Sequence, residues 1–178
     1  MIPVDFLILA QQCAPNVHPV TMAAIVHVES GLNPYAIGVV GGRLERQPRN
    51  SAEALATIRE LIKNGWNFSV GAAQINRYQL ERRGVSYESA LDACTSLRVG
   101  GVILSECYGR ALTGARDPQV ALQQSFSCYY SGNLTRGFAS DSPGGSSYVQ
   151  RVLASASRIN RTAIIPAVRA TNTQEAQP

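Results

Sequence analysis

The sequence predicts an all-α or α-dominated fold that forms a single domain. Apolar residues recur at helical spacing in several segments, most clearly between residues 52 and 64. Proline stands at the start of such segments and glycine just past their end, as Pro19 and Gly31 do. The chain has 178 residues, of which 45% are hydrophobic and 16% are charged. This composition is typical of a globular domain with its own core, and not of a disordered chain.

The first two helices are bounded by residues that stop or start a helix. Val4–Gln12 is a short apolar segment that ends before Pro15. Thr21–Ser30 follows Pro19 and ends just before Gly31, and six of its ten residues are apolar.

The middle of the chain alternates between an irregular region and helices. Residues 35–48 belong to a stretch rich in proline and glycine, so we expect an irregular loop or a small β-hairpin there. Ser51 can cap a helix over Ala52–Asn64, and Gly65 ends it. Further helices are expected at Gln74–Arg83, Ser86–Cys94, Leu97–Leu112, Pro118–Tyr130 and Ser146–Ser157.

The C-terminal end differs in composition from the rest of the chain. After Ile159 the residues are mainly threonine, alanine, asparagine, glutamine and proline, without helical periodicity. We therefore predict a domain over residues 1–158 and a flexible tail over residues 159–178.

Charge, cysteine and histidine counts exclude several classes of protein. The net charge is +4, and no basic block is interleaved with aromatic residues, so nucleic-acid binding is not expected. Two histidines and no Cys-x-x-Cys pair argue against a metal site. The longest apolar runs are too short to cross a bilayer. An export signal is not evident, because Asp5 stands where a signal peptide carries positive charge.

Glu29 is the strongest candidate for a catalytic residue. It lies at the end of an apolar helix, before a glycine and a proline-containing loop. The negative end of the helix dipole and the apolar neighbours both favour its protonated form. A carboxyl group that stays protonated near neutral pH is suited to general acid catalysis.

Two further segments carry amide and aromatic side chains that suit a carbohydrate. Gly71–Asn76 places small residues before Gln74 and Asn76, whose amides can donate and accept hydrogen bonds. Cys128–Asn133 ends a predicted helix in two tyrosines, a glycine and an amide. Aromatic and amide groups together can contact both the apolar faces and the hydroxyl groups of sugars.

The order and spacing of these motifs resemble the lytic transglycosylase family. Its catalytic domain resembles goose-type lysozyme and cleaves peptidoglycan. The resemblance covers about residues 6–157, and the segments His27–Gly38 and Asp92–Leu97 are most similar to the transglycosylases of type IV secretion and conjugation systems. It implies an α-dominated, lysozyme-like fold.

The resemblance assigns roles to individual residues. Glu29 matches the single catalytic acid, and Ser30 matches a serine that forms hydrogen bonds beside it. Gln74 and Asn76 match residues that line the sugar cleft. Tyr129 matches a tyrosine expected near the acid, and Tyr148 a late tyrosine that closes the cleft. Asn133 is a further candidate for binding the sugar. The sequence departs from the family at Ala73, where a methionine is usual, and at Tyr130, where an asparagine is usual.

The family chemistry that the resemblance implies needs one acid and no cofactor. Glu29 would protonate the oxygen between N-acetylmuramic acid (MurNAc) and N-acetylglucosamine (GlcNAc), and then accept a proton from the C6 hydroxyl. The product is a 1,6-anhydro sugar, formed without water. Glu45 is a possible second carboxylate, since most glycosidases use two, but its loop position among arginines favours a surface role.

Other functions remain open at this point. The same scaffold can act as a hydrolytic muramidase, or the chain can be a non-catalytic assembly subunit whose tail contacts other secretion subunits. The expected partners are peptidoglycan strands and, through the tail, other type IV secretion subunits.

The four cysteines bear on the compartment. Cys13, Cys94, Cys107 and Cys128 allow three pairings, and in a reducing compartment they would be buried hydrophobic residues. The periplasm that the resemblance implies is oxidising and favours disulfides. The pairing we favour joins Cys13 to Cys94 and Cys107 to Cys128.

Overall fold

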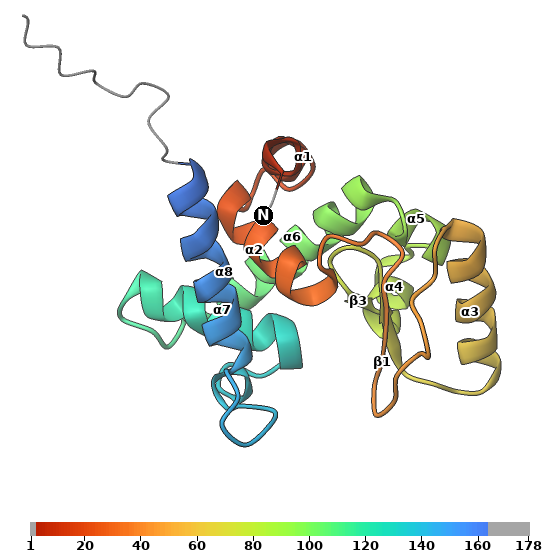
Figure 1. Ribbon diagram of the computed structural model, residues 1–178. Helices are drawn as coiled ribbons and strands as arrows, with labels where there is room; N and C mark the ends of the chain where they lie inside the picture. The colour runs from red at the N-terminus through yellow and green to blue at the C-terminus, as the bar shows by residue number, and fades with distance from the viewer. Residues whose placement is uncertain (1–2, 164–178) are drawn as a thin grey trace, which may run out of the picture.

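The computed structural model describes residues 3–163, and in this range the fold is α-dominated, as predicted. The helices are α1 (Val4–Cys13), α2 (Pro19–Ser30), α3 (Ser51–Lys63), α4 (Arg77–Arg83), α5 (Tyr87–Ala90), α6 (Ala93–Leu112), α7 (Pro118–Ser131) and α8 (Tyr148–Ala163), with a 3₁₀ turn at Arg136–Phe138. The strands are β1 (Ile37–Val39), β2 (Phe68–Val70) and β3 (Ile75–Asn76). In Figure 1, α1, α2, α6, α7 and α8 gather on one side, while the strands and α3 lie on the other.

Helix α2 lies at the centre of the core. Five consecutive residues, Met22 to Val26, have no exposed surface. A helix that is apolar on all sides must be covered on all sides, and α1 and α8 both pack against it. Tyr148, Val149 and Val152 are the buried residues that α8 contributes near its start. The end of α2, with Glu29, is thereby fixed in a packed helical frame.

The small sheet is antiparallel, with strand order β1-β2-β3. Ile37 pairs with Val70, and Ser69 pairs with Asn76. Strand β1 lies in the region where a hairpin or loop was expected, but its partner is β2 on the far side of α3 and not a neighbouring strand in residues 35–48. The sequence analysis did not predict β2 or β3, because strands of two or three residues carry no periodic signal.

Side-chain caps explain where helix boundaries differ from the prediction. Asn50, and not Ser51, accepts the hydrogen bond that starts α3. Asn76 caps α4, so that helix begins at Arg77 and not at Gln74. Asp92 accepts from the backbone N–H of Thr95 and starts α6, which places Cys94 in α6 and not in the preceding helix.

Helix α8 passes through the predicted boundary between residues 158 and 159. It continues to Ala163, and Ile159 is 6% exposed and belongs to the core. The boundary between domain and tail stays a prediction. The rest of the predicted tail, residues 164–178, lies outside the described residues.

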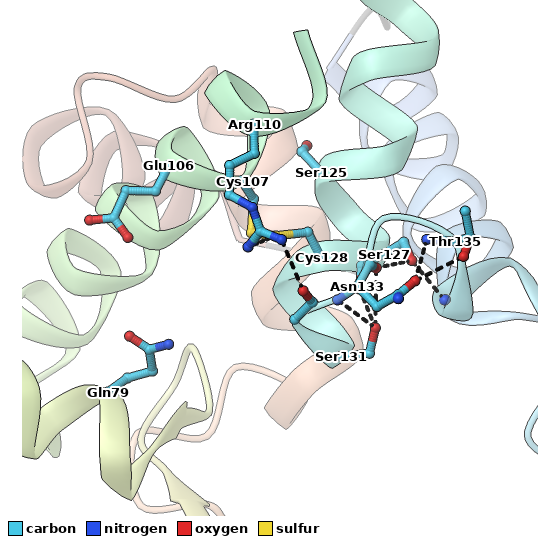
Figure 2. Close-up of a disulfide and its surroundings, with 12 residues drawn as sticks. Gln79, Glu106, Cys107, Arg110, Ser125, Ser127, Cys128, Ser131, Asn133 and Thr135 are labelled. Atoms are coloured by element: carbon cyan, nitrogen blue, oxygen red, sulfur yellow. Dashed lines mark hydrogen bonds between the residues drawn. A yellow bond between two sulfur atoms is a disulfide. The ribbon is translucent and has the colours of Figure 1, made fainter. Parts of the chain in front are cut away.

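Two disulfides join helices, with the pairing that the sequence analysis favoured. Cys13–Cys94 ties the end of α1 to the start of α6, with 5.1 Å between the Cα atoms. Cys107–Cys128 ties α6 to α7, with 5.7 Å between the Cα atoms (Figure 2). In residues 3–163, no helix has both the length and the apolar character needed to cross a bilayer.

Candidate active site

A groove of about 420 Å³ separates the sheet and its loops from the end of α7. One wall is formed by β1 and the loop that follows it, through Leu44. Tyr129 and Tyr130 from α7 line the opposite side, and Glu29 and Gln74 complete the lining. The groove therefore collects residues from segments that lie far apart in the sequence. A concave site with a few polar groups is the usual form of a small-molecule or glycan site.

Glu29 lies in the last turn of α2, where Gly31 ends the helix. Gly31 has a φ of +61°, and its N–H donates to the carbonyl of His27. Burial raises the pKa of the Glu29 carboxyl from its ordinary value of 4.5 to about 7, because removal from water disfavours the charged form. A hydrogen bond from Tyr148 and the positive charge of Arg151 act against this rise. Among the described residues that line the groove, Glu29 is the only carboxylic acid.

Tyr148 connects α8 to the carboxyl group of Glu29. Its hydroxyl donates to Glu29 Oε1 at 2.5 Å, and its side chain is only 2% exposed. The Arg151 guanidinium lies 5.8 Å from the centre of the Tyr148 ring. Tyr148 was expected to close the cleft. It is not among the groove-lining residues, so its contact with a sugar stays a prediction.

Removing the Tyr148 hydroxyl should raise the pKa of Glu29 further. The hydrogen bond from Tyr148 favours the ionised carboxylate, so Tyr148→Phe takes away a group that lowers the pKa. We expect the carboxyl ¹³C resonance of Glu29, followed by NMR against pH, to titrate above the wild-type value of about 7. Tyr78→Phe, on the exposed face of α4, is the matched control. An unchanged or lower pKa in Tyr148→Phe would contradict this account.

Ser30 holds the end of α2 against the turn that precedes β3. Its hydroxyl donates to the carbonyl of Ala72 at 2.7 Å and to that of Val26 at 3.1 Å. Both acceptors are backbone atoms. Ser30 therefore fixes the backbone beside Glu29, and the hydrogen bonds expected beside the acid are made to the main chain.

Gln74 has an unusual backbone conformation at the edge of the groove. Its φ is +49°, and its side-chain amide donates to the carbonyls of Ala36 and Gly71 at 2.9 and 3.0 Å. The first bond joins the turn at residues 71–74 to the residue just before β1, and the second lies within the turn. The position opposite is Gly38, where a Cβ would lie 2.7 Å from Gln74 Oε1. A larger residue there would require the Gln74 amide to shift from its present position.

The three other residues with expected sugar contacts lie in different surroundings. Tyr129 lines the groove, and its hydroxyl donates to the carbonyl of Ala73 at 2.7 Å. Asn76 caps α4, and Asn133 accepts hydrogen bonds from the backbone N–H groups of Thr135 and Arg136 within its own turn (Figure 2). Neither asparagine is among the groove-lining residues. Their contact with a sugar stays a prediction.

Sequence reasoning missed two parts of the site. The tyrosine pair at the end of α7 was expected to suit a sugar, but a site role was assigned only to Tyr129, and yet Tyr130 also lines the groove beside Glu29. The wall from Gly38 to Leu44 was expected only as a loop. The one signal in the sequence for the place of Tyr130 in the groove was its position next to Tyr129. The described residues contain no group of three or more histidine, cysteine or acidic side chains that could hold a metal ion.

The groove, its single acid and the helical frame define a glycan-cleaving enzyme of the lysozyme-like kind, and sequence comparison agrees. The chain belongs to the family described as "Transglycosylase SLT domain", whose sequence pattern matches residues 6–144. The chain is thus a lytic transglycosylase, as the sequence analysis predicted.

Among lytic transglycosylases, the chain is similar to proteins named virB1. The "Type IV secretion system protein virB1" of Brucella suis biovar 1 (strain 1330) is 55% identical over 170 residues, which are 94% of this chain and 71% of the relative. The protein of the same name from Brucella abortus biovar 1 (strain 9-941) is 54% identical over the same shares. "Protein virB1" of Agrobacterium fabrum is 34% identical over 157 residues, 87% of this chain and 60% of the relative. No solved structure matches the chain.

Proposed function

We propose that this lytic transglycosylase cleaves the MurNAc–GlcNAc bond of peptidoglycan with Glu29 as its only acid and base, and that it opens the cell wall for a type IV secretion apparatus. The observation that supports the chemistry is the state of Glu29. Its carboxyl has a pKa of about 7 and is the only acid that lines the groove in the described chain. Such a group can give up a proton and take one back at neutral pH.

The reaction follows from one carboxyl group and the substrate's own atoms. Protonated Glu29 gives its proton to the glycosidic oxygen as the bond from that oxygen to C1 of MurNAc breaks. The carbonyl oxygen of the MurNAc acetamido group bonds to C1 and takes the place of a second carboxylate. Ionised Glu29 then accepts the proton of the C6 hydroxyl. The C6 oxygen attacks C1 and displaces the acetamido oxygen, which gives the 1,6-anhydro ring and restores Glu29.

The arrangement around Glu29 suits both halves of this cycle. Tyr148 donates to Oε1, which leaves Oε2 available as the atom that transfers the proton. Arg151 lies near enough to lower the pKa of Glu29, and so it favours the carboxylate that must form after the first transfer. Burial alone would hold the proton too tightly for the second transfer.

The cellular role rests on the named relatives and on the disulfides. Proteins called type IV secretion system proteins are more than half identical to this chain over almost its full length. Two disulfides suit an oxidising compartment, and the substrate lies in the periplasm, so we place the enzyme there. Other subunits of the secretion apparatus are the expected protein partners.

The mass of the products tests the reaction. Purified peptidoglycan sacculi digested by the full chain should release disaccharide-peptides that end in 1,6-anhydro-MurNAc. These products are lighter by one water than those of a muramidase run beside it as control. Products that carry a reducing MurNAc end would assign the hydrolytic reaction, and an absence of soluble products would assign a non-catalytic role.

A further inference from the structure

Tyr130 lines the groove beside Glu29, and the reaction described above does not use it. It is the penultimate residue of α7 and is 39% exposed. Asparagine is usual at this position of the family that the sequence resembles, so the resemblance gives the tyrosine no role. A large aromatic ring that is partly exposed in a groove can contribute a large apolar contact to a ligand bound there.

The Tyr130 ring is fixed in orientation from two sides. One face stacks on the ring of Tyr148, with the ring centres 4.6 Å apart and the planes inclined by 14°. At the rim, the Tyr130 hydroxyl donates to Asp141 Oδ1 at 2.7 Å. Asp141 Oδ2 in turn lies 3.5 Å from Nη2 of Arg151, which also donates to the carbonyl of Ser146. Both ends of the loop that carries Asp141 are thus tied to the first turn of α8.

This support leaves one flat surface of the ring for the groove. Tyr148 covers the other face and the hydroxyl is already bonded, so the exposed part of Tyr130 is the free face and its edge. Tyr148 donates a hydrogen bond to Glu29 and stacks on Tyr130, so Tyr148 is the single residue that connects the Tyr130 ring to the acid. A rigid apolar face at this place matches the C–H face of a pyranose ring.

We propose that Tyr130 is a stacking platform that binds the sugar ring beside the bond cleaved by Glu29. The inference rests on the proposed function, since it takes the substrate to be a glycan. Tyr130 would contribute mainly to binding, because a stacked face contacts the sugar before and during the reaction alike. Asp141 and Arg151 are positioning residues that hold the ring without touching the sugar.

Binding to an inactive enzyme tests the platform directly. In a Glu29→Gln background, the dissociation constant of a GlcNAc–MurNAc tetrasaccharide is measured by calorimetry for Tyr130, Tyr130→Ala, Tyr130→Leu and Tyr130→Phe. We expect the Ala and Leu variants to bind about tenfold more weakly, and the Phe variant to stay within about twofold, because Phe keeps the flat ring. Tyr78→Ala, which removes an exposed tyrosine outside the groove lining, should bind as the parent does.

Kinetics on the active enzyme separate binding from support of Tyr148. With Glu29 restored, Tyr130→Leu should raise KM by about tenfold and change kcat by less than about threefold. Unchanged binding and KM in Tyr130→Leu would overturn the platform. A fall in kcat with a shifted pH profile and unchanged KM would overturn it too, because Tyr130 would then act only through Tyr148. If the wild type binds the glycan but releases no products, the proposed reaction fails while the binding series still decides the role of Tyr130.

Discussion

Glu29→Gln should lower the rate of peptidoglycan cleavage by at least about 10³-fold, since one group supplies both proton transfers. Glutamine has the same shape and can still accept the hydrogen bond from Tyr148, but it has no proton to give to the glycosidic oxygen. In the described groove no second carboxylic acid is available to replace it. The measurement is the initial rate of soluble muropeptide release from sacculi.

Glu45→Gln is the matched control for this change. Glu45 lies in the loop after β1, is exposed, and is not among the groove-lining residues. Its removal changes the net charge by the same amount as Glu29→Gln, so it reports any effect of charge on binding to the anionic wall. Comparable losses in both variants, or substantial activity in Glu29→Gln, would show that Glu29 is not the acid.

The Glu29→Gln variant should be more stable towards unfolding than the wild type above neutral pH. The folded-state pKa of Glu29 is about 7 against an ordinary value of 4.5, so ionising this carboxyl costs folding free energy. The cost is absent below pH 4.5, where the group is protonated in both states, and complete once the pH exceeds the folded pKa of about 7. The shift corresponds to at most about 3 kcal/mol. Chemical denaturation at pH 4 and pH 8 measures the difference, and it shows that any lost activity is not lost folding.

The helical frame could be predicted from the sequence because its helices carry their own boundaries. Thr21–Ser30 was bounded by Pro19 and Gly31, and the structure has a helix from Pro19 to Ser30 with Gly31 in the left-handed conformation. The strands could not be predicted in the same way. Ile75 and Asn76 form a strand only because β2 lies beside them, and nothing within residues 71–76 carries that information.

The acid of the site was predictable, but its surroundings were not. Glu29 stood out because a carboxyl group ends an otherwise apolar helix. Burial is the largest cause of the raised pKa of Glu29, and it outweighs the opposing effects of Tyr148 and Arg151. Tyr148 approaches it across 119 positions of sequence, and Tyr130 reaches the groove by stacking on Tyr148. Such contacts depend on how α2, α7 and α8 pack, and residue spacing along the chain does not encode them.

Removing the Cys13–Cys94 disulfide should cost about 4 kcal/mol of folding free energy, because the loop that it closes is long. The two cysteines are 81 positions apart, while Cys107 and Cys128 are 21 apart. Chain entropy alone therefore makes the loss larger for the first bond, by about 1 kcal/mol. Packing adds to this difference, because α6 and α7 form the most extensive helix contact of the fold, whereas α1 is a ten-residue helix with two buried side chains.

The double variants Cys13→Ala/Cys94→Ala and Cys107→Ala/Cys128→Ala make a matched pair for this prediction. Urea denaturation should give the lower midpoint for the first variant. Hydrogen exchange should locate the loss in α1, since Ala10 and Cys13 are the buried residues that hold this helix to the core. Slow exchange that persists in α1 without the bond would contradict the prediction, and so would a larger loss from the Cys107–Cys128 pair. Because α1 packs against α2, whose last turn carries Glu29, the first disulfide stabilises the helical frame that holds the acid.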